Sequence, residues 1–325
     1  MFKLSVIIPI YNTAPYIERC VESLMRQTID QIEYIFINDA STDNSLDILY
    51  EILKKYPNRY SKVIDLKQNG GISNARSIGL KYATGEYITH CDSDDWIDSE
   101  MYTTLYILAT EKDADIATCN FTHEYMAYSK DFLQPYSSDM QENMKRLLIG
   151  DIFPSIWASI IKRELISSHE IDFPKNLNMG EDLLFNVKAY LFANKIIHTN
   201  IPYYHYRHTN NSVCVRRSRK SIDSDIIIAR CIEDFLTENG YQEIYKKEIA
   251  YRKFFSKEAL IRNFDNKEEY YEWLNIYPET HKRILSYKKI EPKLRFMLWL
   301  ASKHLFIASV IIKKFLNWQH SLRNY

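Results

Sequence analysis

The fold of this chain is set by its first apolar run, Leu4-Ser5-Val6-Ile7-Ile8, which Pro9-Ile10-Tyr11-Asn12 follows. The run is short, rich in β-branched residues and apolar throughout instead of alternating. This pattern is typical of a strand that is buried on both faces of a parallel sheet. A helix is predicted directly after it, with Thr13 as its cap, Pro15 in its first turn, and a buried face formed by Ile17, Cys20, Val21 and Leu24.

The strand and helix unit then repeats. Strands are predicted at residues 33–37, 63–64 and 86–90, and helices at 46–53 and 73–83. The second of these helices is expected to end before Gly85 and to turn inward the residues Ala75, Ile78, Gly79 and Tyr82. Alternating strands and helices imply right-handed crossovers and a mainly parallel, open sheet. Ligands of such sheets bind beyond the carboxyl ends of the strands.

Length and composition narrow the class of protein. The 325 residues leave room for about two domains, and 42 basic against 42 acidic residues disfavour a generally basic nucleic-acid binder. The five cysteines are spread along the chain without a Cys-x-x-Cys pair, which argues against a disulfide framework and a cysteine zinc site. The start of the chain lacks the pattern of a secretory signal. We therefore expect a folded protein of a reducing compartment, the cytoplasm.

Polar residues follow each predicted strand of the repeat. They are Tyr11-Asn12, the stretch 38–43, Asn69-Gly70-Gly71, and the stretch 91–96. A Gly-x-Gly-x-x-Gly turn is missing after the first strand, which argues against a dinucleotide-dependent dehydrogenase. The chain has no Gly-x-x-x-x-Gly-Lys-Ser/Thr loop, which excludes a P-loop kinase or NTPase.

The sharpest of these stretches is Asp92-Ser93-Asp94-Asp95. Neighbouring carboxylates at such spacing repel each other by about 3 kcal/mol per pair, and a hard divalent cation removes that cost. The alternative is a solvated loop that caps a helix starting at Ser99. Upstream, residues 69–76 place two glycines before a helix start with Arg76 in its second turn, which favours an anion such as a diphosphate, although a plain tight turn has the same pattern.

In this order, the motifs at residues 5–12, 38–43, 69–79 and 92–95 resemble those of the family 2 glycosyltransferases, which have the GT-A fold. Gly180-Glu181-Asp182, followed by Tyr206-Arg207-His208 and Ser212, resembles the acceptor-side and closing motifs of that family. The resemblance covers about residues 3–213. It implies an α/β catalytic domain at 1–221, with a donor half at 1–98 and an acceptor half at 99–221. Residues 222–325 are expected to form a helical C-terminal region.

The resemblance also implies roles on the donor side. The donor-binding residues would be Pro9, Tyr11, Asn12, Asp39, Asn69, Arg76, Asp92, Ser93, Asp94 and Arg207. Within this set Asp39 would accept from the nucleotide base, and Arg76 would reach the base or the diphosphate. Mn²⁺ or Mg²⁺ would be held by Asp92 and Asp94, with Asp95 and His208 as further candidates. Two departures are Asn38, where the family often has Asp, and Ala40, where it often has Gly.

On the acceptor side, Asp182 would be the general base of an inverting transfer, and Glu181 would orient it or replace it. Without the upstream motifs, both acids would be read as favourable charges at a helix start. Trp96 and Trp157 are candidates for stacking on an acceptor sugar, and Trp157 could instead anchor a helix at 158–165. Residues 121–150 are expected to be irregular.

The last segment is basic and amphipathic. No acidic residue follows Glu291, whereas six Lys or Arg residues do. On one helix over residues 292–320, a single apolar stripe would be formed by Leu294, Met297, Leu298, Ala301, Leu305, Ala308, Ile312, Phe315 and Leu316. The stripe predicts either a helix lying on an anionic membrane surface or packing on the catalytic domain or a dimer partner.

Together these observations predict a metal-dependent hexosyl- or N-acetylhexosaminyl-type transferase. It would move sugar from a nucleotide sugar, a UDP-sugar by resemblance, to a glycan or lipid-linked acceptor in surface polysaccharide synthesis, on the inner face of the cell membrane. The alternatives are a sugar-phosphate nucleotidyltransferase, which would want a basic Gly-rich loop after the first strand, and a non-catalytic binding or scaffold protein. No nucleic-acid partner is expected.

Overall fold

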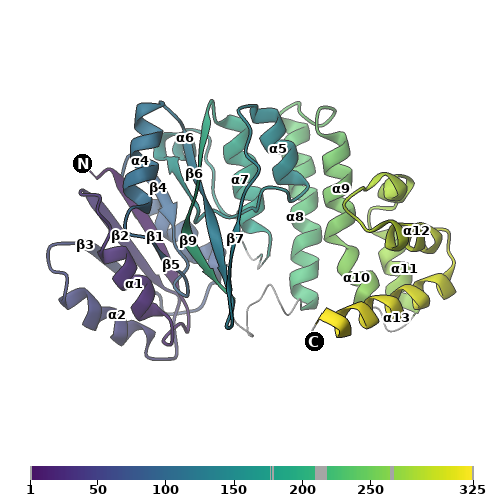
Figure 1. The fold of residues 1–325 in the computed structure, drawn as a ribbon, viewed down its shortest axis with the longest axis horizontal. Coiled ribbons are helices and arrows are strands. Elements are labelled where there is room, and N and C mark those ends of the chain that lie inside the picture. Colours follow the sequence, from purple (N-terminus) through teal and green to yellow (C-terminus); the bar gives the residue numbers. More distant parts are fainter. Residues whose placement is uncertain (1, 176, 178, 209–217, 264–266, 324–325) are drawn as a thin grey trace. The chain divides into compact units, whose positions relative to one another are not determined.

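The computed structural model describes residues 2–175, 177, 179–208, 218–263 and 267–323. The chain divides into two compact units, Met1–Arg216 and Arg217–Tyr325. This division lies five residues before the predicted boundary after residue 221. Figure 1 shows strands and helices in the first unit and helices in the second.

The start of the first unit repeats strand and helix as predicted. Its elements are β1 (Leu4–Ile10), α1 (Ile17–Met25), β2 (Ile32–Asn38), α2 (Ser45–Lys54), β3 (Tyr60–Asp65), α3 (Ile72–Tyr82) and β4 (Tyr87–His90). Strand β1 pairs in parallel with β2 and with β4, and β2 pairs in parallel with β3. The carboxyl ends of β1, β2 and β4 therefore lie side by side.

The remainder of the first unit extends this sheet. Its elements are β5 (Trp96–Ile97), α4 (Met101–Glu111), β6 (Ile116–Glu124), β7 (Ser129–Phe132), α5 (Met140–Leu148), β8 (Ser159–Lys162), α6 (Arg163–Ser168), α7 (Glu181–Phe192) and β9 (Ile196–Arg207). Over the described residues the strand order is β3-β2-β1-β4-β8-β6-β9-β5, with β7 paired to β6. Strands β8, β5 and β7 pair antiparallel, so the sheet is mixed beyond β4.

Two predictions in this part were wrong. Residues 121–150 contain the end of β6, the strand β7 and helix α5, and residues 159–162 form β8 where a helix was predicted. Strand β6 is hard to recognise because it buries polar side chains. Thr118 hydrogen-bonds His198 and Asn120 donates to the carbonyl of Asn200, and such partners offset the cost of burial.

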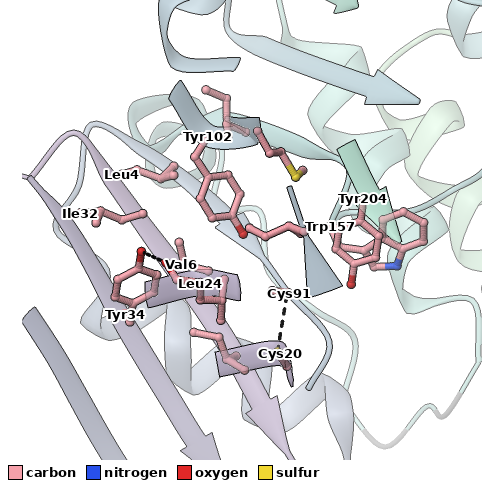
Figure 2. Packing of buried hydrophobic residues seen from close by; sticks show 14 of the residues in the cluster. Leu4, Val6, Cys20, Leu24, Ile32, Tyr34, Cys91, Tyr102, Trp157 and Tyr204 are labelled. Carbon is pink, nitrogen blue, oxygen red and sulfur yellow. Dashed lines mark hydrogen bonds between the residues drawn. The ribbon is translucent and has the colours of Figure 1, made fainter. Parts of the chain in front are cut away.

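Successive residues of β1 pack on opposite faces of the sheet. Leu4, Val6 and Ile8 join a core cluster with residues of α1 and α4, and Figure 2 shows Leu24 and Tyr102 in that cluster. On the other face Ile7 meets Gly79 of α3, where a Cβ added to the glycine would lie 2.3 Å from the Ile7 side chain. Helix α3 can therefore approach the sheet closely, which brings its residues near the strand ends.

The inner face of α3 differs from the predicted one. Tyr82 is exposed, whereas Arg76 is buried. An unpaired buried guanidinium would be costly, so burial of Arg76 requires partners. Helix α1 begins at Ile17, and the carbonyl of Thr13 accepts the amide of Ile17, so Thr13 lies in the turn before the helix.

The second unit is helical, as expected. Its elements are α8 (Arg219–Glu238), α9 (Lys246–Ser256), α10 (Glu258–Asn263), α11 (Lys267–Asn275), a 3₁₀ helix at Pro278–Ser286, α12 (Pro292–Ala301) and α13 (Phe306–Arg323). The predicted helix 292–320 is broken at residues 302–305, where His304 has a φ of 62°. Among the described residues, no helix has the length and apolar content that a membrane span needs.

Part of the apolar stripe predicted for residues 292–320 belongs to the core of its own unit, although Leu305 is 50% exposed. Leu294, Leu298, Ala301 and Ile312 are buried in a cluster around Trp273 and Phe254. These residues therefore do not face a membrane, because helices α12 and α13 use them to pack on the rest of the C-terminal unit.

Candidate active site

The loops after β1 and β2 are tied together by short hydrogen bonds. The amide of Asn12 donates to the hydroxyl of Ser41, and the Asn12 side-chain oxygen accepts the amide of Thr42 at 2.8 Å. Pro9 is buried within β1, and Tyr11, just after it, is about half exposed. Of these predicted donor residues, Tyr11 and Asn12 are thus accessible at the edge of the sheet.

Asp39 holds the glycine turn before α3. Its two carboxylate oxygens accept the amides of Gly70 and Gly71, each at 2.8 Å, and its carbonyl accepts the side-chain amide of Asn69. Gly71 has a φ of 82°, a conformation that glycine adopts without strain. Asp39, Asn69 and the glycine turn therefore come together as predicted, and Asp39 shapes the turn through its backbone amides.

The two departures from the family pattern have local explanations. Asn38 donates its side-chain amide to Asp65 at 2.7 Å, a contact in which an aspartate would bring two negative charges together. Ala40 has a φ of 56°, in the left-handed region where a glycine has no Cβ to crowd the backbone. The chain therefore carries mild backbone strain at Ala40.

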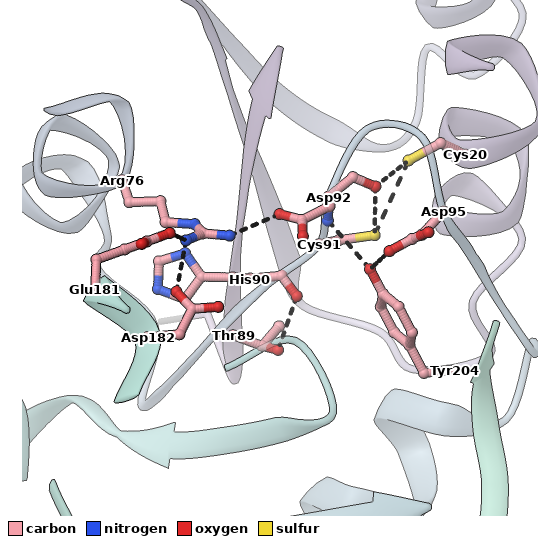
Figure 3. Close-up of polar contacts among 10 residues, drawn as sticks. All are labelled: Cys20, Arg76, Thr89, His90, Cys91, Asp92, Asp95, Glu181, Asp182 and Tyr204. Atoms are coloured by element: carbon pink, nitrogen blue, oxygen red, sulfur yellow. Dashed lines mark hydrogen bonds and ion pairs between the residues drawn. The ribbon is translucent and has the colours of Figure 1, made fainter. Parts of the chain in front are cut away.

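Arg76 is the centre of the site. From the fifth position of α3 its guanidinium contacts Asp92 after β4 at 2.8 Å, and Glu181 at 3.0 Å and Asp182 at 2.6 Å in the first turn of α7 (Figure 3). The Arg76 side chain is 3% exposed, and those of Asp92, Glu181 and Asp182 are 23%, 12% and 21% exposed. One buried cation thus joins residues that are about 90 positions apart in the sequence, and its carboxylate partners reach solvent.

The charges of this cluster do not balance, because three carboxylates share one guanidinium. Burial raises the pKa of Asp182 well above its ordinary value, and the charges of Glu181 and Asp92 act in the same direction, while Arg76 opposes them. Burial by itself would lower the pKa of Arg76, but the charges of the three carboxylates outweigh this effect and raise the pKa above its ordinary value. The arrangement can therefore accept a proton at Asp182 while Arg76 stays charged.

The carboxylates of the 92–95 loop point in different directions. Burial, together with the charge of Asp92, raises the pKa of Asp94 to about 6. Asp95 is turned inward, where its oxygens accept the Tyr204 hydroxyl and the Arg207 amide, both at 2.7 Å. Ser93 is also buried. Both carboxylate oxygens of Asp95 thus bind other parts of the protein, which corrects the prediction that Asp95 is a metal ligand.

Asp92 and Asp94 remain the residues that fit a divalent cation. A positive charge beside Asp94 would relieve the like-charge repulsion that helps to raise its pKa. Mg²⁺ and Mn²⁺ are commonly bound by one or two carboxylates, with substrate phosphate and water completing the shell. Within the described part of the chain, no group of three or more His, Cys, Asp or Glu is placed to hold a metal alone.

His208 lies elsewhere than predicted. Its ring nitrogen Nε2 is 2.7 Å from Nδ1 of His123, and its ring stacks on Tyr125 with centroids 4.2 Å apart. It therefore belongs to an aromatic cluster at the end of β6 and β9, which corrects its assignment to the metal shell. Ser212 and the basic residues Arg216 and Arg217 lie outside the described residues.

Arg207, predicted to bind the donor, contacts the 92–95 loop. Its side chain donates to the carbonyl of Asp94 at 3.0 Å, and its guanidinium carbon lies 4.8 Å from the ring centroid of Trp96. The Trp96 ring stacks on His205, and Arg19 lies 3.3 Å from the same ring centroid. Trp96 is 9% exposed, and these side chains cover its ring. No face of the ring is therefore open to a sugar.

Trp157 is a core residue. It is 2% exposed, and its ring stacks on Tyr204 and Tyr206 with centroid distances of 4.0 and 5.6 Å. The prediction of an acceptor platform at Trp157 is therefore replaced by its alternative, an anchor in the core, although the segment it anchors is β8 and not a helix.

Tyr204 is a site residue that the sequence analysis missed. Its hydroxyl donates to Asp95 and accepts the amide of Asp92, so it fixes the backbone of the aspartate loop from β9. Figure 3 shows this hydroxyl between the two aspartates. The only signal was its position two residues before the Tyr206-Arg207-His208 motif, on the same face of β9 as Tyr206.

Comparison with known proteins identifies the family. The model of the family described as "Glycosyl transferase family 2" matches residues 5–169. The chain is 34% identical over 253 residues to the putative glycosyltransferase EpsH of Bacillus subtilis, covering 76% of this chain and 72% of EpsH. It is 31% identical over 210 residues to the poly(ribitol-phosphate) beta-N-acetylglucosaminyltransferase TarS of Staphylococcus aureus, and this match covers 63% of this chain and 35% of TarS.

The fold has a solved counterpart. The crystal structure of residues 1–349 of S. aureus TarS in complex with UDP-GlcNAc superposes with a TM-score of 0.74 at 23% identity. The match covers 98% of this chain and 92% of that one. The predicted α/β GT-A fold with a helical C-terminal region is thereby confirmed.

Proposed function

This chain belongs to glycosyl transferase family 2, and from that premise we propose that it is an inverting transferase in which Asp182 is the general base. The observation that carries the proposal is the position of Arg76, whose guanidinium contacts Asp92 of the donor-side loop and both acids of α7. A donor held at the strand ends and an acceptor beside α7 would meet at this cluster.

The donor end consists of the loops after β1, β2 and β4. Asn12 and Tyr11 are available to the nucleotide, and the Asp39 carboxylate holds the Gly70-Gly71 turn, where α3 begins. Free amides at the start of a helix favour an anion such as a diphosphate. Asp92 and Asp94 would hold Mn²⁺ or Mg²⁺, which supplies positive charge to the diphosphate and to the leaving group.

The proton is handled at α7. Nη1 of Arg76 is bound to Oδ1 of Asp182, and we assign the other oxygen, Oδ2, to the acceptor hydroxyl. That hydroxyl gives its proton to Asp182 while its oxygen forms the new bond to the anomeric carbon. The bond from that carbon to the diphosphate breaks, and the nucleoside diphosphate leaves with the electron pair. A carboxyl whose pKa is raised by burial is better matched to this task near neutral pH.

Glu181 and Arg76 are positioning residues in this scheme. Arg76 bridges the two acids, so it fixes the orientation of Asp182, and Glu181 takes part of the guanidinium charge. Because the cluster carries an excess of negative charge, Asp182 is not held as a tightly neutralised ion and can take up a proton.

The names of the relatives support a proposal for the substrate class. TarS is named for the transfer of N-acetylglucosamine to a ribitol-phosphate polymer, and its crystal structure contains UDP-GlcNAc. We propose a UDP-hexose or UDP-N-acetylhexosamine as donor, and a hydroxyl of a glycan or lipid-linked acceptor in the synthesis of a cell-surface polymer. A peripheral position at the inner face of the membrane is part of the same proposal.

The Asp182→Asn variant tests this assignment. It keeps the shape of the side chain and removes its basicity, so the variant is expected to bind UDP with Mn²⁺ as the wild type does and to lose transfer by at least about 10³-fold. A panel of nucleotide sugars, followed by hydrolysis of the donor, identifies the substrate for the assay. Transfer at the wild-type rate by Asp182→Asn would exclude Asp182 as the base.

A further inference from the structure

A second apolar face of the C-terminal helices remains after the predicted stripe is assigned to the core. On α13, Ile307, Ile311, Lys314 and Trp318 are spaced by four, three and four residues, which places them along one side of the helix. Ile307 is 76% exposed, Ile311 55% and Trp318 59%. We call these four residues the outer face of α13. They lie opposite Ile312, which is fully buried.

Exposed apolar side chains at regular helical spacing differ from scattered ones, because they form a continuous strip that water solvates poorly. Other residues of α13, namely Ile312, which is buried, and Phe306 and Val310, which are partly buried, already pack on the C-terminal unit. The outer face is therefore not needed for the core of that unit. In the preceding helix, Phe296 is also about half exposed, next to Lys293 and Arg295.

The charge of the segment that carries this face has one sign. From residue 292 to the end, the sequence has six Lys or Arg residues and no Asp or Glu. Lys293, Lys303 and Lys314 are exposed. A segment with exposed Ile and Trp side chains and only positive charges is complementary to a surface that is apolar below and anionic above, which is the composition of an acidic lipid bilayer.

We propose that the outer face of α13 docks on an anionic lipid surface, with Ile307, Ile311 and Trp318 in the interfacial region and the lysines at the lipid headgroups. The helix lies in the plane of the surface, since none of the described helices is suited to cross a membrane. This docking is independent of the assignment of Asp182, and it would keep the enzyme close to a lipid-linked acceptor.

The test uses the full chain and two kinds of vesicle, one of phosphatidylcholine alone and one of phosphatidylcholine mixed with phosphatidylglycerol. We expect co-sedimentation with the mixed vesicles, reversed by high salt, and at least about 10-fold less with the neutral ones. The double variant Ile307→Ser/Ile311→Ser is expected to lower partitioning to the mixed vesicles by at least about 10-fold. The matched control is Ile227→Ser/Ile244→Ser, two isoleucines of the same unit that are each 47% exposed.

A second measurement needs no apolar substitution. The combined fluorescence of the five tryptophans is expected to shift to shorter wavelength when mixed vesicles are added, and Trp318→Phe should remove that shift. Equal binding to both vesicle types, or equal binding by the Ile307→Ser/Ile311→Ser and control variants, would overturn the proposal. So would a dimer in light scattering that the Ile307→Ser/Ile311→Ser variant dissociates, because the face would then be covered by a second copy of the chain.

Discussion

Arg76 of the first unit and Lys257 of the second are both deeply buried cations, and they have opposite surroundings. Arg76 meets three carboxylates that reach solvent at the strand ends. Lys257 donates to the carbonyls of Trp273 and Ile276, at the end of α11, and contacts His281 at 2.7 Å. The carboxylates raise the pKa of Arg76, whereas burial lowers the pKa of Lys257 to about 7.

This difference separates a reactive site from a structural one. Carbonyl oxygens at the end of a helix need donors, and a lysine that supplies them completes the fold. An excess of carboxylates around an arginine does not improve stability, because the like charges repel one another. Such an arrangement is expected where protons or cations are exchanged.

The largest expected effect is on activity, in Arg76→Gln. Loss of the guanidinium leaves the three carboxylates without a counter-charge and Asp182 without its positioning contact, so kcat/KM should fall by about 10³-fold. Because the loss of one partner of a buried ion cluster can also unfold a protein, Arg76→Lys is measured in parallel. It keeps the charge but not the two separate nitrogens that reach Asp92 on one side and the acids of α7 on the other, and a fall of about 10²-fold with normal circular dichroism is expected. Full activity of a folded Arg76→Lys would remove the distinction between the two buried cations.

Lys257→Met should give the converse result. The buried carbonyls of α11 lose their donor, which is expected to lower the free energy of unfolding by about 2 kcal/mol. Below the lowered melting temperature, kcat/KM should stay within about twofold of the wild type. Urea denaturation and steady-state rates measure the two quantities. A folded variant with greatly reduced kcat/KM would show that Lys257 has a catalytic role.

The excess of carboxylates also predicts that the affinity for a divalent cation depends on pH. Cation binding must displace the proton from Asp94, whose pKa is raised to about 6. The affinity for Mn²⁺ with UDP is therefore expected to be flat above pH 6 and to fall by up to about 10-fold per pH unit below it. Titration calorimetry at several pH values measures this, with Asp94→Asn as a weak, pH-independent control.

Without the cation, the effect of pH on stability runs the other way: the contribution of Asp94 to stability is lost as the pH rises, whereas cation affinity is lost as the pH falls. The folded protein holds the Asp94 proton more tightly than the unfolded chain does. This stabilisation is complete below the unfolded pKa of about 4 and is lost as the pH rises through about 6.

A Mn²⁺ affinity that is unchanged down to pH 5 would place the cation away from Asp94.

The smallest effect concerns the backbone at the same edge of the sheet. Ala40→Gly removes a Cβ from a residue with a φ of 56°, so the free energy of unfolding should rise by about 1 kcal/mol without a change in activity. Ala109→Gly, in the last turn of α4, is the matched control and should destabilise by about 1 kcal/mol. If both substitutions destabilise the protein equally, Ala40 is not strained.

The first unit shows how far sequence alone reached. The strands β1, β2 and β4 were predicted because their apolar runs are buried on both faces, and β3, at the edge of the sheet, because of Val63 and Ile64. The polar residues after these strands came together at one edge as expected. The structure places Asp39 at the glycine turn and joins Arg76 to Asp92 and Asp182, while the roles of these residues stay predictions. Their contacts were not predictable, since the pairing of Arg76 with α7 depends on where α3 and α7 pack.

The failures have physical causes of their own. Strand β6 was missed because it buries threonine and asparagine, which are satisfied by partners distant in sequence. Trp96 and Trp157 were taken for sugar platforms because a sequence does not show what covers an aromatic ring. The helix 292–320 was expected to be continuous, and the break at His304 turned its apolar stripe into the core of a helical unit.

The central claim is that Arg76 and Asp182 act as one unit in the transfer step, and a double-mutant cycle on kcat/KM tests it most directly. Rates are measured for the wild type, Arg76→Gln, Asp182→Asn and the double variant with one donor and acceptor. We predict that the double variant is about as slow as the slower single variant, because the second substitution removes a partner whose function is already lost. Losses that multiply in the double variant would contradict the claim.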